Sequence, residues 1–144
     1  MRAKDQGELP ESHSAAQRRA LLKYVKRTAA LLHLRDWEFE VSPEPASEEA
    51  AAQIVVPAAQ KRAVLYVCPN FFTQSPSWQR QTICHELIHC HLAATRGLLE
   101  RFTREMGETR EADVLFSSLD FTLEMATDGL ADAFATAAEL PALA

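Results

Sequence analysis

Two histidines four residues apart, with a glutamate directly after the first, limit most strongly what this chain can fold into. The segment His85-Glu86-Leu87-Ile88-His89 has the pattern H-E-x-x-H inside a run with helical apolar spacing. Residues four apart share one face of a helix, so both imidazoles can reach a single Zn²⁺. Glu86 is offset by one position and can take a proton from a metal-activated water. The pattern indicates a zinc-dependent hydrolase; the alternative is a surface helix that carries these residues by chance.

Length and composition favour one soluble globular domain. The chain has 144 residues, of which 47% are hydrophobic and 24% charged. The net charge of −5 argues against a nucleic-acid partner, which would favour a basic surface. Residues 1–14 are polar, and no apolar run approaches the roughly 18 residues of a membrane span. We therefore expect neither a secretory signal nor a membrane segment.

The three cysteines suit a reducing compartment. Cys68, Cys84 and Cys90 are too few for a disulfide framework, and Cys68 lacks the paired cluster of a cysteine-ligated zinc site. We interpret all three as small buried hydrophobes. The expected location is the cytoplasm of a bacterium or of a phage-infected host cell.

The N-terminal third predicts a tail, a helix and a strand. Residues 1–13 are polar and predict a flexible tail, followed by a single domain over 14–140. Ser12 or Ser14 can cap a helix that runs to about Leu34. Trp37–Val41 alternates as a half-buried strand does. The helix bears basic residues and no acid, which fits a docking face or a solvated outer face: Arg18, Arg19, Lys23, Lys26 and Arg27.

The remaining pattern predicts a hairpin and two long helices. An acidic loop over 43–49 precedes two β-branched runs, 53–56 and 63–67, which we interpret as a hairpin. The motif helix is expected from Ser75 to about Phe102, and a last helix over 108–139, bent or interrupted at Gly129. The predicted fold class is α+β: an N-terminal helix, a small three-stranded sheet, the motif helix and a C-terminal helix.

A third zinc ligand has to come from outside the motif helix. One turn beyond His89 the same face offers Leu92 and Ala93, which cannot bind metal, and His91 lies about 200° around the helix. The last helix is apolar on two sides, which predicts burial on both. One side holds Leu115, Leu119, Ala126, Leu130, Ala133, Phe134 and Ala137 around Leu123; the other holds Val114, Phe121 and Met125.

Between these two sides runs a polar seam that offers carboxylates. It consists of Ser117, Asp120, Glu124 and Asp128 and continues in Ala131 and Ala135. Glu124 and Asp128 are four residues apart, so one can bind a metal while the other accepts a hydrogen bond from a ligand histidine. The alternative is a seam that simply faces solvent.

The two motifs together resemble the gluzincin metallopeptidases. His85-Glu86-x-x-His89 followed by Glu124-x-x-x-Asp128 on a later helix is similar to their His₂Glu site. The order of elements is similar to the minigluzincins and to the peptidase domain of the ImmA/IrrE group. The likeness in architecture covers about residues 14–140, whereas the specific motifs cover some nine positions.

The resemblance implies a role for each matching residue. His85, His89 and Glu124 would bind Zn²⁺, Glu86 would be the catalytic general base and acid, and Asp128 would support a ligand histidine. The implied substrate is a protein or peptide, bound along an edge strand for which residues 53–56 are our candidate. Such enzymes usually also have a Tyr or His that stabilises the oxyanion; Tyr66, His33 and Arg96 are candidates, and Arg96 equally fits a solvated surface residue.

Two related zinc patterns fail on spacing. One needs Gly and His at positions 92 and 95, where the chain has Leu92 and Thr95, and a SprT-like pattern needs His at position 93, where Ala93 stands. The leading hypothesis is thus a zinc metalloendopeptidase. The alternatives are a catalytically weak or inactive gluzincin-like protein-binding or regulatory module, and a helical protein without metal. The sequence leaves the oligomeric state open.

Overall fold

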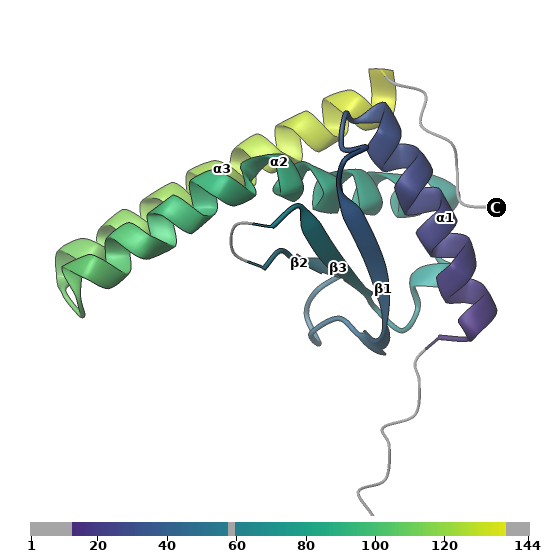
Figure 1. Ribbon diagram of the computed structural model, residues 1–144, viewed down its shortest axis with the longest axis horizontal. Helices are drawn as coiled ribbons and strands as arrows, with labels where there is room; N and C mark the ends of the chain where they lie inside the picture. Colours follow the sequence, from purple (N-terminus) through teal and green to yellow (C-terminus); the bar gives the residue numbers. More distant parts are fainter. Residues whose placement is uncertain (1–12, 58–59, 138–144) are drawn as a thin grey trace, which may run out of the picture.

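A computed structural model describes residues 13–57 and 60–137, which form an α+β fold (Figure 1). The described part holds three α-helices and one three-stranded sheet, which confirms the expected fold class. The elements are α1 (Ala15–Leu31), β1 (Glu38–Pro45), β2 (Ala52–Val55), β3 (Arg62–Val67), the 3₁₀ turn η1 (Phe71–Thr73), α2 (Pro76–Met106) and α3 (Arg110–Ala137).

The sheet is mixed, with β3 in its centre. β1 pairs with β3 in parallel and β2 pairs with β3 antiparallel, so the predicted hairpin is present and β2 forms one edge. The acidic loop predicted over 43–49 is wrong at its start, because β1 runs on through Pro43 and Pro45. Prolines are tolerated there because β1 is the other edge strand, and its pairing shifts register between Val41 and Pro45.

One apolar core joins the sheet, α1 and the first half of α2. Ser14 caps α1 in a capping box with Gln17, and α1 then buries Leu21 and Val25 beside β1. Of the predicted tail, only His13 lies within the described residues. It is buried, with its ring 5.1 Å from that of Phe72.

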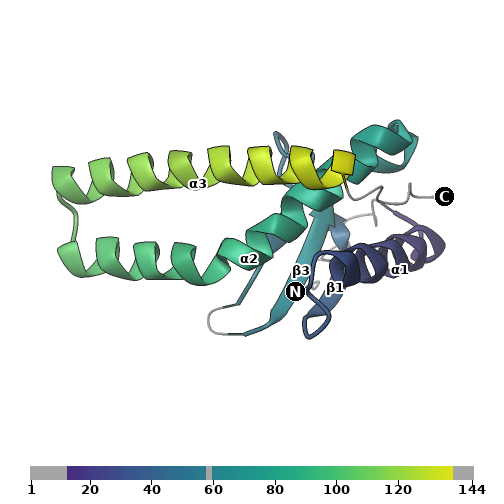
Figure 2. The ribbon, with the colours of Figure 1, turned by 90° about the horizontal axis from the view of Figure 1, so that it is seen from above.

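The motif helix α2 is much longer than its contact with the sheet. Ser75 caps it, Pro76 occupies its first turn, and it ends at Gly107, whose φ is +75°. With 31 residues it is about 46 Å long. α2 and α3 form an antiparallel hairpin whose distal half projects beyond the sheet and α1 (Figures 1 and 2). We call the part of the hairpin from the Arg96–Asp120 ion pair to the turn, residues 96–120, the arm.

The prediction that α3 buries two apolar sides is wrong. Leu119, Leu130 and Phe134 on one side are exposed, as are Phe121 and Met125 on the other. The buried residues of α3 instead have small or short side chains: Ala112, Thr127 and Ala131. The reason is that α3 packs closely on one neighbour, α2, and small residues permit that approach.

Two further predictions concern the ends and the continuity of the helices. α3 continues through Gly129 without a break, and its expected end past residue 137 lies outside the described residues. None of the described helices combines the length and apolar character that a membrane crossing requires.

Candidate metal centre

Helix α2 presents the two motif histidines to α3. Its opposite side carries Ile83 and Leu87, which are buried in the core and fix the rotation of the helix. The rings of His85 and His89 lie edge to face with centroids 4.8 Å apart, and their Nε2 atoms are 3.1 Å from each other. Both rings thus direct the same nitrogen to one point.

Helix α3 brings a carboxylate to the same point. Glu124 Oε1 lies 3.3 Å from His89 Nε2, and Glu124 Oε2 lies 3.7 Å from His85 Nε2. Ligand atoms at about 2.1 Å from a tetrahedral ion lie about 3.4 Å from one another. His85, His89 and Glu124 therefore form a cluster that could hold a metal ion, with ligand atoms all within 4.8 Å of one another.

The second carboxylate of the seam lies behind one histidine. Asp128 Oδ1 is 2.9 Å from Nδ1 of His85, on the far side of the ring from Glu124. A carboxylate in this position accepts the Nδ1–H bond and leaves the lone pair of Nε2 directed at the cluster. The structure thus brings Glu124 and Asp128 to the histidines in different places, one beside the ligand nitrogens and one behind them.

The surroundings favour a neutral imidazole at His89. Burial lowers the pKa of His89 below its ordinary value, and the neighbouring His85 and Arg96 lower it further, whereas Glu124 and Asp128 oppose the change. Metal binding requires the neutral ring with a free lone pair. At neutral pH the residue therefore holds the form that a metal needs.

Glu86 lies on α2 beside the cluster but is not one of its three residues. Its side chain is buried, and burial raises the pKa of its carboxyl from 4.5 to about 7. A hydrogen bond with the backbone of Ile54 in β2 lowers that pKa, and the charge of Glu124 raises it. Glu86 thus lies between the edge strand and the metal cluster, with a carboxyl group that can hold or release a proton near neutral pH.

The three candidates for oxyanion stabilisation have different surroundings. Arg96 lies on α2 beyond His89 and forms ion pairs with Asp120 of α3 and, at 3.6 Å, with Glu100. His33 is exposed, with φ of 60°, just after α1, and Tyr66 is half-buried on β3. Among the described residues, neither His33 nor Tyr66 forms a hydrogen bond or ion pair with the cluster. No sequence pattern predicts the Arg96–Asp120 pair, because it depends on how α2 and α3 are aligned.

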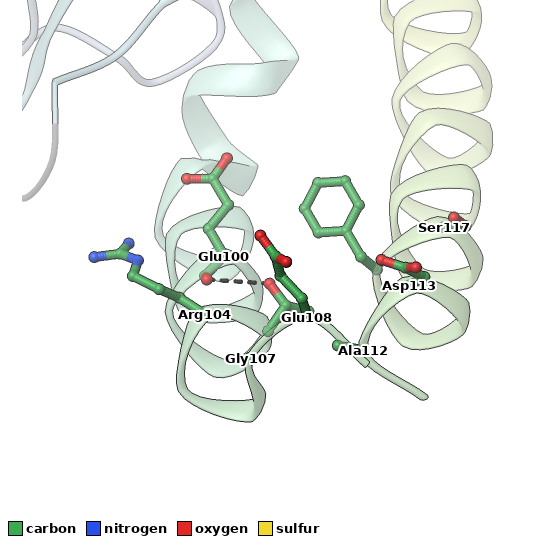
Figure 3. A pocket seen from close by; sticks show the side chains of 9 residues that line it. Glu100, Arg104, Gly107, Glu108, Ala112, Asp113 and Ser117 are labelled. Atoms are coloured by element: carbon green, nitrogen blue, oxygen red, sulfur yellow. Dashed lines mark hydrogen bonds between the residues drawn. The ribbon is translucent and has the colours of Figure 1, made fainter. Parts of the chain in front are cut away.

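The cluster lies at an open surface. The side chain of Glu124 is 41% exposed and that of Asp128 is 72% exposed. A separate depression of about 540 Å³ lies between α2 and α3 near the hairpin turn (Figure 3). Its charged lining comes from Glu100, Arg104, Glu108 and Asp113, and it includes none of the cluster residues. A ligand of the cluster would thus approach from solvent rather than fill an enclosed cavity.

Comparison of the chain with protein-family models, with curated proteins and with solved structures finds no match.

Proposed function

We propose that this protein is a zinc metallopeptidase of zincin-like architecture, in which His85, His89 and Glu124 bind the ion. The observation that carries the proposal is the convergence of three ligand atoms beside a buried carboxyl that is not one of them. Two imidazoles and one carboxylate are a common ligand set of catalytic zinc, which keeps a fourth position open. The absence of enclosure suits a protein or peptide as substrate.

The metal and the protein would contribute different parts of the chemistry. A bound Zn²⁺ supplies Lewis acidity, which polarises a carbonyl group and makes water more acidic. The chain supplies proton transfer and orientation. Asp128 holds the ring of His85 through Nδ1, and the apolar side of α2 holds both histidines in register.

Glu86 is the group we assign to proton transfer. Its carboxylate takes a proton from the attacking water while the water oxygen bonds to the peptide carbonyl carbon. When the C–N bond breaks, Glu86 returns that proton to the leaving nitrogen, so the carboxylate is regenerated. Because Glu86 lies beside the ligand residues without being one of them, the same carboxyl can serve both directions of this transfer.

Metal analysis and a cleavage assay on matched variants test the proposal. Wild type, Glu86→Gln, Glu124→Ala and the control Glu111→Ala are loaded with zinc, and cleavage of an unfolded protein is then measured. Glu111 is exposed in the first turn of α3, away from the cluster. We expect Glu86→Gln to bind zinc normally but to lose about 10²-fold or more in cleavage rate, and Glu124→Ala to lose zinc. Unchanged turnover in Glu86→Gln, or equal zinc in Glu124→Ala and wild type, contradicts the proposal.

One observation favours a second function, a metal-containing protein-binding module. Within the described residues, neither a Tyr nor a further His forms a hydrogen bond or ion pair with the cluster, where such peptidases usually have an oxyanion donor. A wild-type protein that is fully loaded with zinc and cleaves no member of a panel of unfolded proteins and peptides supports this alternative. A protein that binds no zinc excludes both functions.

A further inference from the structure

The exposed apolar side chains of this protein are concentrated on the α2–α3 hairpin. Among the described residues with large apolar side chains, only Leu31 and Val55 are exposed elsewhere. Those on the hairpin are Leu98, Phe102, Met106, Val114, Leu119, Phe121, Met125, Leu130 and Phe134. Contiguous exposed apolar surface on a soluble protein usually marks an interface.

Three of these residues form a continuous stripe along the arm. Leu98, Phe102 and Met106 follow one another at intervals of four on α2, and Leu98 and Phe102 are 58% and 61% exposed. Leu98 directly precedes the buried Leu99, and Phe102 directly precedes the half-buried Thr103. Consecutive residues lie about 100° apart around a helix. The stripe therefore lies along one flank of α2, beside the buried side of the arm.

The surface of the stripe has the form that receives a helix. Leu98, Arg101, Phe102 and Glu105 line a depression of about 250 Å³. Their spacing of i, i+3, i+4 and i+7 is that of the four residues that surround one inserted side chain in knobs-into-holes packing. The stripe thus offers both an apolar hole and apolar side chains large enough to fill one.

We propose that the occupant of this stripe is α2 of a second copy, packed antiparallel about a two-fold axis. With the two-fold axis beside Phe102, Leu98 of one copy meets Met106 of the other and the two Phe102 side chains meet each other, so the stripe covers itself. Arg101 of each copy then lies within one turn of Glu105 of the other, which pairs opposite charges twice. A two-fold interface requires such self-complementarity.

The shape of the arm agrees with this occupant, whereas the stripe alone is smaller than a standard interface. Because the arm projects beyond the sheet and α1 (Figure 2), an antiparallel pair places the two folded bodies at opposite ends of the contact. The three stripe residues expose about 300 Å² of apolar surface, whereas a standard interface buries about 800 Å² per partner. The contact must include the flanking arm surface, and we expect a dimer that dissociates in the micromolar range.

Sedimentation velocity of the full chain from 1 to 200 µM tests the dimer. Wild type is expected to approach twice the chain mass of 16.1 kDa with rising concentration. Leu98→Glu is expected to weaken association at least tenfold, because it places a charge in the apolar contact. Leu31→Glu is the matched control, since Leu31 is 51% exposed at the end of α1 and lies outside the hairpin. Circular dichroism verifies that both variants keep their helix content.

A charge swap distinguishes a second copy from another protein partner. Arg101→Glu and Glu105→Arg should each weaken self-association, and the double variant should restore it, because the swap returns both opposite-charge pairs. A wild-type chain that remains monomeric to 200 µM overturns the proposal. So does equal weakening of self-association by Leu98→Glu and Leu31→Glu, or a double variant that associates no more strongly than the single variants. These outcomes are independent of the proposed peptidase function.

Discussion

Asp128 and Glu124 differ in what they contact, although both face the motif histidines. Asp128 contacts only the outer nitrogen of His85 within the cluster, at 2.9 Å. Loss of such a partner typically lowers metal affinity by about 10- to 100-fold, because the partner fixes the orientation of the ring that binds the ion. We expect Asp128→Asn to bind zinc about tenfold more weakly than wild type in a competition titration with a chromophoric chelator.

The control for this titration is Asp132→Asn, one turn further along the exposed side of α3. It removes the same charge from the same helix without touching His85. Equal affinity losses in the two variants would show that only the net charge of α3 matters, and Asp128 would then have no orienting role.

The buried carboxyl of Glu86 makes the stability of the metal-free protein depend on pH. Its pKa is about 7 in the folded protein, against an ordinary 4.5. The folded state therefore binds the proton more tightly than the unfolded state, so the contribution to stability is full below pH 4.5 and is lost as pH rises through 7. Between pH 5 and pH 8 the free energy of unfolding should fall through this group by up to ~3 kcal/mol.

Urea unfolding of wild type and Glu86→Gln in the presence of a chelator measures this contribution. Gln cannot ionise, so the difference between the two proteins isolates Glu86 from the other groups that titrate. We expect the stability of wild type relative to Glu86→Gln to decline from pH 5 to pH 8. A difference that is constant over this range would show that Glu86 is not desolvated in the folded protein.

At the scale of the elements, the glycines of the hairpin test how α2 and α3 are built. Gly129 lies within α3, and a Cβ there would meet no atom within 4 Å. Gly129→Ala should raise the free energy of unfolding by about 0.5–1 kcal/mol, because Ala restricts the unfolded chain and favours helix. Chemical denaturation measures the change, and a loss of stability would show that α3 is interrupted at this position.

Gly107 provides the opposite sign in the same hairpin. A Cβ there also meets open space, but φ is 75° and ψ is −168°, a conformation that residues with side chains rarely adopt. Gly107→Ala should therefore cost about 1–3 kcal/mol. If Gly107→Ala is as stable as wild type, the connection between the helices does not depend on this backbone conformation.

Sequence patterns predicted those features of the helices and strands that depend only on residues close by in the chain. Ser75, Pro76 and Gly107 indicated where α2 begins and where the chain breaks after it, although the helix itself runs four residues beyond the expected Phe102. The path of β1 through Pro43 and Pro45 was not predictable, because it depends on which side of the strand β3 occupies. Phe121 and Met125 were expected to be buried but are exposed. The prediction failed because apolar periodicity does not reveal how many neighbours a helix has.

The same distinction applies to the candidate site. The spacing of His85 and His89, and of Glu124 and Asp128, was enough to suggest that they share a site, since each pair lies on one helix face. The contact of Glu86 with Ile54 and the pairing of Arg96 with Asp120 join different elements. Their existence depends on the alignment of α2 with β2 and with α3, which no local pattern encodes.

At the scale of the whole molecule, α3 depends on α2 for its attachment. Within the described part of the chain, α3 packs mainly on α2, and the buried residues of α3 are few and small. The Arg96–Asp120 pair and the candidate metal cluster join the two helices at separate levels. An ion held by His85, His89 and Glu124 would therefore connect α3 to the core through α2.

This arrangement makes metal binding a global stabiliser with a local signature. Zinc at 100 times its dissociation constant should raise the free energy of unfolding by about 2.7 kcal/mol, and a chelator should remove this gain. Hydrogen exchange should slow mainly in α3 around Glu124 and in α2 around His89, and little in β1, because the ion stabilises the contact between these helices. Glu124→Ala should abolish both effects. Slowing spread evenly over β1 and α3, or stabilisation of Glu124→Ala equal to that of wild type, would place the bound metal elsewhere and remove the link between α2 and α3.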